Sequence, residues 1–413
     1  MRLAVLAMDP PGGWLSVPIY VVKSLSGFSR LPHWPRNSIA SWSSIRLCTA
    51  YLPERERFMF EIDIRPEWSL RTHGGAALPD HLIRLLAAVH ATGSLAAACR
   101  ACRLSYRYAW GLLQQAQALL GVPLLRPVRG RGAQLTGFGE RLVWADRRIA
   151  ARLSPMLESL ATEIGIELER TLSDQAAPLR MHASHGFGVE ALRRFLAEAG
   201  TPLDLKYRSP DDALAALRAG ACDLAGLHLP VGPMQQELLA HYAGRLDPQH
   251  DRVVHLAVRR QGIVLAPGNP KGVRALADLL RPDLRFIHRQ PGSGTRLLLE
   301  RLLAHEGLDI ARIHGCDVEE LTHAAVAAYV ASGLADAGFG LEPPARRYGL
   351  DFIPILSEHY FFLCDGSLLA HAPLAGIVEV LRGEPFRTEL DRLPGYDASL
   401  CGRVQTLAEA FPA

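Results

Sequence analysis

Several features that define other classes of protein are absent from this sequence. Its 413 residues include only seven cysteines, an odd number scattered along the chain, so we expect reduced, buried thiols and not a disulfide framework. No apolar run approaches the roughly 18 residues of a membrane helix, and the run from Leu15 to Val22 is broken by Pro18. The apolar start ends at Asp9, short of a signal peptide. We therefore expect a cytoplasmic protein without a membrane span.

Motifs for catalysis and metal binding are absent as well. The sequence has no Gly-x-Ser-x-Gly elbow, no set of protein-kinase motifs and no dinucleotide-binding glycine fingerprint. Cys99-x-x-Cys102 lies in an expected helix and has no second pair at zinc-finger spacing. His182-x-x-His185 has no third ligand nearby in the sequence. We therefore expect no catalytic residue, no metal site and no cofactor, and a protein that is not an enzyme.

The composition is that of a folded protein of two or three domains. Hydrophobic residues make up 49% of the chain and charged residues 21%, which excludes a disordered or collagen-like chain. Residues 1–58 have several prolines and serines and neither a helical nor a strand period. We predict little stable structure there, and one hypothesis is that this leader is a start-site artefact and that translation begins at Met59.

The net charge of +3 conceals an uneven distribution. Residues 100–152 have ten arginines against Glu140 and Asp146, whereas residues 153–413 have 25 basic and 33 acidic side chains. A short basic block attached to a large acidic body indicates a polyanion-binding module joined to a separate domain.

Residues 59–145 have the pattern of a winged helix-turn-helix domain. Apolar residues recur at the i, i+3, i+4 and i+7 spacing of a helix from Leu82 to Val89. A second short helix is predicted from Ser94 to Cys102, and a third from its N-cap Ser105 to about Leu120. Three helices with a tight turn before the third are typical of a helix-turn-helix.

The third helix and the segment after it are the predicted DNA-binding elements. Residues 124–135 are two short apolar pieces around a basic, glycine-containing turn, which predicts a β-hairpin wing; a solvated basic loop is the alternative. We expect Trp110 to pack inside the protein. The side chains expected to contact double-stranded DNA, at its phosphates or base edges, are Ser105, Tyr106, Arg107, Gln114, Arg126, Arg129 and Arg131.

The remainder of the chain is predicted to be a long helix followed by an α/β domain. The amphipathic segment from Phe138 to about Arg170 indicates a linker helix, with the linker assigned to residues 146–177, and such a helix commonly joins two protomers into a homodimer or higher homo-oligomer. Short apolar strands alternate with helices across residues 178–413, which predicts parallel sheets in two lobes with a ligand-binding cleft between them. The fold class is therefore mixed.

An anion site is predicted where the two lobes meet. The segment from Gln290 to Thr295 follows a strand and opens a helix, so backbone N–H groups and hydroxyls converge at the positive end of that helix. A simple helix cap is the alternative, and the spacing is not that of a nucleotide P-loop. The side chains of Ser184, His185 and His228 follow strands of the first lobe, although either histidine is as often a structural group.

Arginines near this segment could neutralise a dianion, or could pair with acidic neighbours instead. Tyr360, from a late strand, is a weaker candidate. The candidate ligand-binding residues are Ser184, His185, His228, Arg289, Ser293, Gly294, Thr295, Arg296 and Tyr360.

Two resemblances add to these inferences. The first is formed by Thr92-Gly93-Ser94, Leu104-Ser105-Tyr106-x-x-Ala109-Trp110 and Leu135-Thr136-x-x-Gly139-Glu140. These segments resemble the winged helix of the molybdate-responsive regulator family, a relative of the LysR-type regulators, over about residues 78–145. In that family the middle segment is the recognition helix, so the resemblance implies DNA contacts by Ser105, Tyr106 and Arg107.

The second resemblance lies in the α/β domain, over roughly residues 178–400. It is formed by Gly226-x-His228-Leu229, Ala266-Pro267-Gly268-Asn269-Pro270-Lys271-Gly272, Arg289-Gln290-Pro291-Gly292-Ser293-Gly294-Thr295-Arg296 and Ala335-Asp336-Ala337-Gly338-Phe339-Gly340. These segments are similar to cytoplasmic relatives of the periplasmic molybdate-binding proteins, domains that also occur fused to molybdopterin-biosynthesis proteins. Typical molybdate-responsive regulators have a small β-barrel effector domain instead, so the ligand is not transferred directly from them.

Together these features predict a one-component transcription regulator. The expected effector is molybdate, tungstate or a molybdenum-cofactor-related anion bound between the lobes. A LysR-like regulator of a small organic acid is the first alternative, and a molybdenum-cofactor metabolism protein with an attached DNA-binding domain is the second.

Overall fold

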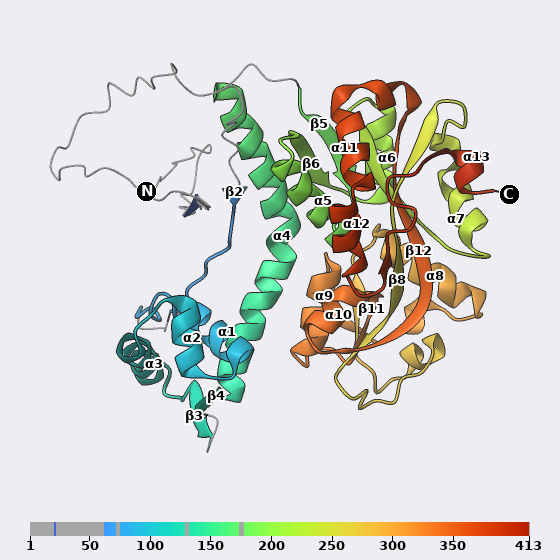
Figure 1. Cartoon of the computed structure of the whole chain (residues 1–413). Helices are drawn as coiled ribbons and strands as arrows, with labels where there is room; N and C mark the ends of the chain where they lie inside the picture. Colours follow the sequence, from blue (N-terminus) through green and yellow to red (C-terminus); the bar gives the residue numbers. More distant parts are fainter. Residues whose placement is uncertain (1–19, 22–61, 72–74, 129–131, 173–176, 413) are drawn as a thin grey trace, which may run out of the picture.

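The computed structural model describes residues 20–21, 62–71, 75–128, 132–172 and 177–412. Figure 1 shows a small helical domain, one long helix and a larger α/β domain. The strands β1 (Tyr20–Val21) and β2 (Ile62–Asp63) form an antiparallel pair. Apart from β1, the leader of residues 1–58 lies outside the described residues, and the predictions about it stay predictions.

The small domain is the predicted winged helix-turn-helix. Its elements are α1 (Leu82–Thr92), α2 (Leu95–Cys102), α3 (Tyr106–Leu120), β3 (Leu125–Val128) and β4 (Gly132–Leu135). The predicted cap Ser105 is present, since its Oγ accepts a hydrogen bond from Tyr108 N at 3.2 Å, and Ser94 caps α2 in the same way, with Oγ accepting from Ala97 N at 3.4 Å. The strands β3 and β4 pair antiparallel as the wing, so the alternative of an unpaired basic loop is wrong.

The linker helix α4 (Gly137–Leu172) is one continuous element of 36 residues, about 54 Å long at the usual rise of a helix. Its first turns belong to the small domain, because Leu142 and Val143 are buried in that domain's hydrophobic core. The predicted domain boundary at residue 145 therefore falls inside a helix. Figure 1 shows α4 running from the small domain along the side of the α/β domain.

The α/β domain has the two predicted lobes. In lobe one β5 pairs parallel with β6 and β7, and in lobe two β9 pairs parallel with β10 and β11. The strands of the two lobes are β5 (Leu179–Ala183), β6 (Leu203–Tyr207), β7 (Leu224–Pro230), β9 (Phe286–Arg289), β10 (Gly315–Glu320) and β11 (Ala337–Leu341).

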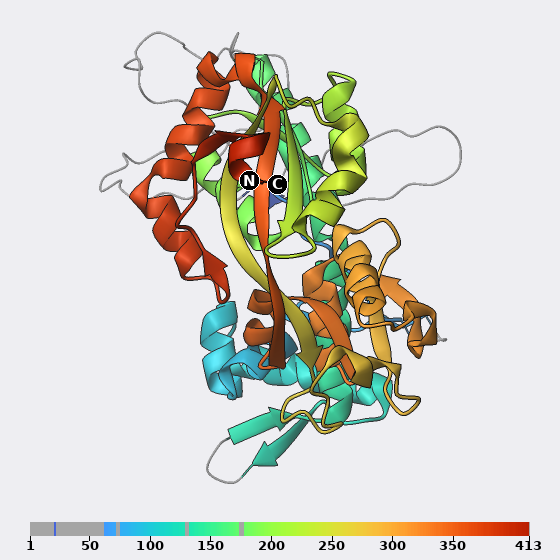
Figure 2. The same cartoon turned by 90° about the vertical axis from the view of Figure 1, so that its right-hand side faces the viewer.

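Two long antiparallel strands, β8 (Asp251–Leu265) and β12 (Asp351–Asp365), connect the lobes. Residues 358–363 of β12 pair with β7 of lobe one. Residues 261–265 of β8 pair with β11 of lobe two. The sequence pattern indicated only short strands at Gly262–Ala266 and Phe352–Ile355, whereas both strands extend over 15 residues. Figure 2 shows them side by side through the height of the domain, so both strands run from one lobe to the other.

Helices cover both faces of this sheet. They are α5 (Phe187–Glu198), α6 (Pro210–Arg218), α7 (Gln235–Tyr242), α8 (Gly294–His305), α9 (His323–Ala331), α10 (Glu342–Arg347), α11 (Ala372–Arg382), α12 (Glu384–Asp391) and α13 (Leu407–Ala410). Two short strands, β13 (Tyr396–Asp397) and β14 (Val404–Thr406), pair with β8. No helix in the described ranges is long and apolar enough to cross a membrane.

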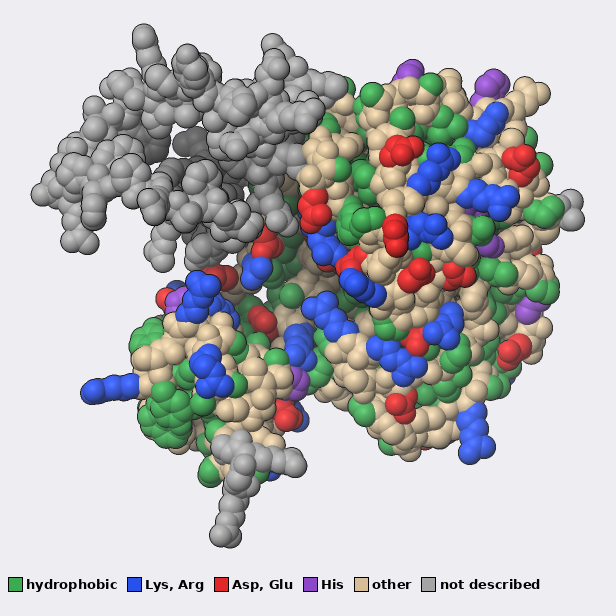
Figure 3. Space-filling model, viewed as in Figure 1, with side chains coloured by type: hydrophobic (Ala, Val, Ile, Leu, Met, Phe, Trp, Pro, Cys, Tyr) green, Lys and Arg blue, Asp and Glu red, His purple; other side chains and the backbone are tan. Residues whose placement is uncertain are grey.

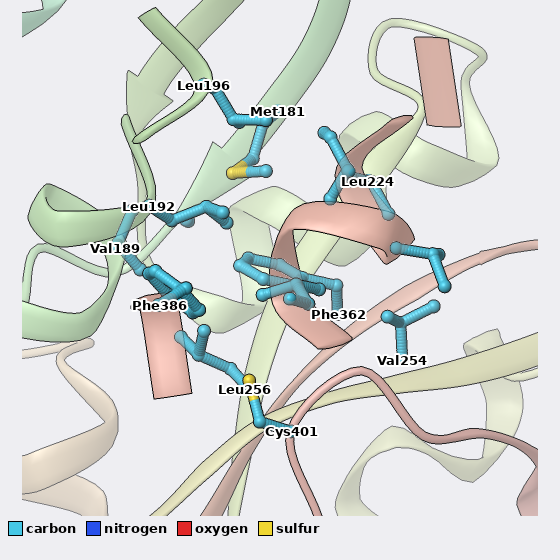
Figure 4. Packing of buried hydrophobic residues seen from close by; sticks show 14 of the residues in the cluster. Met181, Val189, Leu192, Leu196, Leu224, Val254, Leu256, Phe362, Phe386 and Cys401 are labelled. Carbon is cyan, nitrogen blue, oxygen red and sulfur yellow. The ribbon is translucent and has the colours of Figure 1, made fainter. Parts of the chain in front are cut away.

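Apolar side chains from distant segments form the core of lobe one. Figure 4 shows Met181 of β5, Leu192 of α5, Phe362 of β12 and Phe386 of α12 converging from different elements. All four side chains are almost fully buried, and burying a side chain of this size stabilises the fold by about 1.5–3 kcal/mol. This packing fixes β5, which Ser184 and His185 follow, and β12, which contains Tyr360.

Candidate functional site

The predicted DNA-binding face is exposed on α3 and at the start of the wing. Ser105, Tyr106, Arg107, Gln114 and Arg126 are all exposed to solvent. The hydroxyl of Ser105 also caps α3, so its oxygen has a structural role. The predicted residues Arg129 and Arg131 lie outside the described residues. Figure 3 shows basic and apolar side chains together on the surface of this domain.

Two aromatic residues of α3 belong to this face although the sequence did not indicate them. Tyr108 is 49% exposed and Trp110 is 47% exposed, so the expectation that Trp110 packs inside the protein is wrong. Gly111 lies between Arg107 and Gln114 on the exposed side of the helix, and a Cβ there would meet no atom within 4 Å. The fold therefore does not require a glycine at this position.

Three residues form a buried ion-pair network where β8 and β12 cross between the lobes. Arg259 Nε lies 2.6 Å from Glu358 Oε1, and His228 Nδ1 lies 3.0 Å from Glu358 Oε2. The three side chains are at most 6% exposed. Burial disfavours the Glu358 carboxylate, but the charge of Arg259 and the contact with His228 outweigh it and lower the pKa of Glu358 to about 2.

Tyr360 packs inside the same network. Its ring lies 4.4 Å from Arg259 Cζ and stacks against His228 with the ring centroids 6.1 Å apart. Its hydroxyl donates to the backbone oxygen of Ser184 at 3.3 Å. The structure thus brings together the predicted residues His228, Tyr360 and Ser184, but it pairs His228 and Tyr360 with protein groups.

The predicted anion cradle at the start of α8 lies against lobe one. A Cβ on Gly294 would lie 2.2 Å from His228 Cε1, so only glycine permits this approach. Ser293 is the N-cap of α8 and accepts a hydrogen bond from Arg296 N at 3.2 Å. Ser293 and Thr295 are both buried. Glycine, hydroxyls and the positive end of the helix therefore meet at the junction of the lobes.

The two predicted arginines have different surroundings. Arg296 donates to Glu300 Oε1 at 2.9 Å, one turn along α8, which is the acidic pairing that the sequence left open. Arg289 donates to the backbone oxygens of Glu320 and Leu321 at 3.2 and 2.8 Å. Within the described part of the chain no carboxylate lies within 4.0 Å of Arg289, and its buried Nη1 has no hydrogen-bond partner.

His185 points to the linker helix. Its Nε2 lies 3.4 Å from Ser154 Oγ and 3.5 Å from Glu158 Oε1, and its ring lies edge-on to Tyr207. Glu158 Oε2 also accepts a hydrogen bond from the Tyr207 hydroxyl at 2.6 Å. His185 is therefore held between lobe one and α4, apart from the ion-pair network.

His323, which was not predicted, is buried within electrostatic reach of Arg289, Arg259 and His228. Its Nδ1 accepts a hydrogen bond from Leu341 N at 3.2 Å. Burial, followed by the positive charges of Arg289 and Arg259, lowers the pKa of His323 well below its ordinary value. A neutral imidazole can donate and accept hydrogen bonds but adds no charge. The electrostatic potential at this place is therefore set by the neighbouring arginines and is positive.

The charges of this region do not cancel. Arg259 is balanced by Glu358, and Glu320 is balanced by Arg152 of α4, whose Nε lies 2.7 Å from Glu320 Oε2. Arg289 has no such carboxylate. Burial, then the charge of Arg259, lowers its pKa to about 10, so it stays protonated near neutral pH. The arrangement therefore favours a small anion near Arg289.

Comparison with known proteins identifies both parts of the chain. Residues 81–140 match the family model of the bacterial regulatory helix-turn-helix proteins of the lysR family, and residues 193–382 match the model of the PBP superfamily domain. The uncharacterized protein YvgK of Bacillus subtilis is 32% identical over 231 residues, which are 55% of this chain and 73% of that protein.

Two further relatives have names that refer to molybdenum. The molybdenum-pterin-binding protein MopB of Rhodobacter capsulatus is 29% identical over 38% of this chain and 66% of its own length. The molybdenum transport protein ModE of Azotobacter vinelandii is 33% identical over 31% of this chain and 47% of its own length. The chain therefore belongs to the family that includes YvgK, and it is a DNA-binding transcriptional regulator of the LysR type with an effector domain of the PBP superfamily.

Proposed function

We propose that this regulator senses a small oxyanion, namely molybdate, tungstate or a molybdenum-cofactor-related anion, at the junction of its two lobes. The observation that supports this most directly is Arg289. Its guanidinium has no carboxylate partner among the described residues, and its buried Nη1 has no acceptor there. A buried donor without an acceptor costs free energy, and an anion at this position would remove that cost.

The neighbouring groups suit an oxyanion without any bond to its metal centre. The start of α8 offers backbone N–H groups and the hydroxyls of Ser293 and Thr295 at the positive end of a helix. Ser184 and His185 follow the end of β5 in lobe one. The names of MopB and ModE refer to molybdenum, which favours molybdate or tungstate as the first anions to test.

A small organic acid is the alternative ligand. An arginine with a free donor binds a carboxylate as readily as an inorganic oxyanion, and the LysR-type helix-turn-helix is common to both proposals. The comparison of anions in the experiment below separates the two.

We further propose that α3 enters the major groove of DNA and that the chain acts as a homodimer or higher homo-oligomer. The exposed residues Tyr106, Arg107 and Gln114 lie on the outer side of α3, as docking of a recognition helix requires. Met156, Leu160 and Leu168 of α4 are 55, 41 and 41% exposed. An apolar stripe of this kind on a long helix is typical of a dimer contact.

Thermal unfolding of the full chain tests the ligand assignment, because a ligand that binds only the folded protein raises the midpoint. We expect micromolar molybdate or tungstate to raise it, and sulfate or formate to have little effect. The Arg289→Met variant should lose this rise. The Arg285→Met control should keep it, because Arg285 pairs with Asp336 at the surface. A rise with organic acids alone would favour the alternative, and no rise with any anion would contradict the proposal.

A further inference from the structure

The linker helix crosses the junction of the two lobes beside the candidate ligand residues. Towards lobe two, Thr322 Oγ1 donates to Ala151 O at 2.9 Å. Towards lobe one, Thr162 Oγ1 donates to Leu205 O at 3.3 Å. Between these two contacts, residues of α4 contact His185 after β5, Tyr207 at the end of β6 and Glu320 at the end of β10.

Arg152 of α4 is linked to Arg289 through one residue, Glu320. Its Nε donates to Glu320 Oε2 at 2.7 Å, and the Glu320 carboxylate is fully buried. The backbone oxygen of Glu320 accepts a hydrogen bond from Arg289 Nε at 3.2 Å. Arg152 and Arg289 therefore share Glu320, the first at its carboxylate and the second at its carbonyl.

The charge of Glu320 decides whether Arg289 is available to an anion. Glu320 Oε1 is buried and has no hydrogen-bond partner among the described residues. Without Arg152 its negative charge would be uncompensated beside Arg289, where it would attract that guanidinium and repel an incoming anion. Arg152 removes this competition from a position that need not touch the ligand.

A second candidate group depends on α4 in the same way. His185 lies 3.4 Å from Ser154 Oγ and 3.5 Å from Glu158 Oε1. Hydrogen bonds from α4 therefore fix the orientation of its ring. One face of α4 thus reaches groups in both lobes, His185 in lobe one and Glu320 in lobe two.

We propose that α4 forms the third side of the effector site, with Arg152 as a positioning residue that neutralises Glu320 and leaves the charge of Arg289 to the anion. This inference rests on the proposed function. Because α4 continues into the core of the helix-turn-helix domain through Leu142 and Val143, it implies that anion affinity and the position of the DNA-binding domain are coupled, reciprocally by linkage.

Titration of molybdate and tungstate into the full chain and four variants tests the proposal. Arg152→Met should raise the dissociation constant about tenfold, because it leaves the buried Glu320 carboxylate uncompensated beside Arg289. Glu320→Gln should bind at least as tightly as the unmodified chain. The double variant Arg152→Met/Glu320→Gln should bind with nearly the affinity of the unmodified chain. Arg148→Met is the matched control, since Arg148 of the same helix lies 5.8 Å from the Tyr329 ring and has no carboxylate within 4.0 Å among the described residues.

Each outcome separates this inference from the proposed function. Binding by the unmodified chain with unchanged affinity in Arg152→Met would overturn the inference alone. If Arg152→Met binds weakly and adding Glu320→Gln does not restore the affinity, Arg152 has a structural role only. This result would also overturn the inference. If Arg152→Met does not fold, a tenfold loss of affinity in Glu320→Gln would be decisive against it. Absence of binding by the unmodified chain would overturn both.

Discussion

At the scale of single residues, the balance of charge at the lobe junction shows what the sequence could and could not reveal. Arg289 was predicted because its charge lies beside the segment from Gln290 to Thr295, and His228 because it was expected to end a strand, where open α/β sheets bind ligands. In the structure His228 lies inside β7. Arg259 and Glu358 were missed because they lie in the middle of long strands and meet only through the register of β8 with β12. Charged residues inside otherwise apolar strands were the available signal, but their pairing is a long-range property.

Gly294 gives the first prediction at this scale. A Cβ at this position would lie 2.2 Å from His228 Cε1, so Gly294→Ala should destabilise the protein by about 1–3 kcal/mol through overpacking. Chemical denaturation measures the change. The double variant His228→Ala/Gly294→Ala should lose less stability than the two single losses combined, because the truncated side chain makes room. Strictly additive losses would contradict this contact.

Gly111 gives the second prediction: a substitution here should raise the stability of the protein and lower its affinity for DNA. A glycine inside a helix costs about 0.5–1 kcal/mol relative to alanine, and a Cβ at Gly111 would meet no atom within 4 Å. Gly111→Ala should therefore stabilise the chain by about that amount in denaturation. It should also weaken DNA binding if α3 approaches the base edges closely at this point. An unchanged or tighter DNA affinity would show that Gly111 does not face the DNA.

At the scale of elements, the linker helix was predicted well in extent but not in its surroundings. The apolar period indicated a helix from Phe138 to Arg170, and α4 runs from Gly137 to Leu172. The same period indicated a contact with a second protomer, whereas one side of α4 packs on its own effector domain. The pair Arg152 and Glu320 is separated by 168 residues, and helical periodicity contains no information about contacts at that distance.

Pro155 within α4 leads to a prediction about this docking. A proline has no N–H for the carbonyl four residues before it, which here is the Ala151 oxygen, and Thr322 Oγ1 donates to that oxygen instead. Thr322→Val should destabilise the protein by about 1–3 kcal/mol, with a further contribution because Thr322 also caps α9.

The double variant Pro155→Ala/Thr322→Val separates these two contributions. It restores an N–H to Ala151 O, so it should recover about 1 kcal/mol relative to Thr322→Val alone. Pro155→Ala alone should gain less. Equal effects of Pro155→Ala in both backgrounds, measured by urea unfolding, would mean that Thr322 does not replace the missing helical hydrogen bond.

At the scale of the whole molecule, the alternation of short strands and helices predicted two lobes, and both are present. It did not predict that β8 and β12 pass through both lobes. Polar and charged residues such as Arg259, Gln261 and Glu358 interrupt their apolar runs, and these residues are buried only because the lobes meet around them. The anion cradle at the start of α8 was predicted from local sequence. The close contact between Gly294 of this cradle and His228 of lobe one was not predicted.

Buried histidines make the stability of the whole chain sensitive to acid. Burial lowers the pKa of His255 to about 4, and burial with the charge of Arg296 lowers the pKa of His288 to about 4. The unfolded chain binds protons below pH 6.5 or so, while these folded groups do not until about pH 4. Stability should therefore fall between about pH 6.5 and pH 4.

Denaturation at pH 7 and pH 5 measures this loss. The interval from pH 7 to pH 5 lies above the pKa values of about 3.9 and 4.3 at which aspartates and glutamates titrate in the unfolded chain, so histidines dominate the change. The double variant His255→Gln/His288→Gln should show a smaller difference between the two pH values. An equal free energy of unfolding at pH 7 and pH 5 in the unmodified chain would contradict the burial of neutral histidines.

The central claim is that one chain binds an anion and DNA with coupled affinities. The most direct measurement is the dissociation constant for a duplex selected by this protein from random DNA, with and without saturating molybdate or tungstate. The account predicts a change of about 5-fold or more, absent in Arg289→Met. An anion that raises the unfolding midpoint but leaves the DNA affinity unchanged would contradict it.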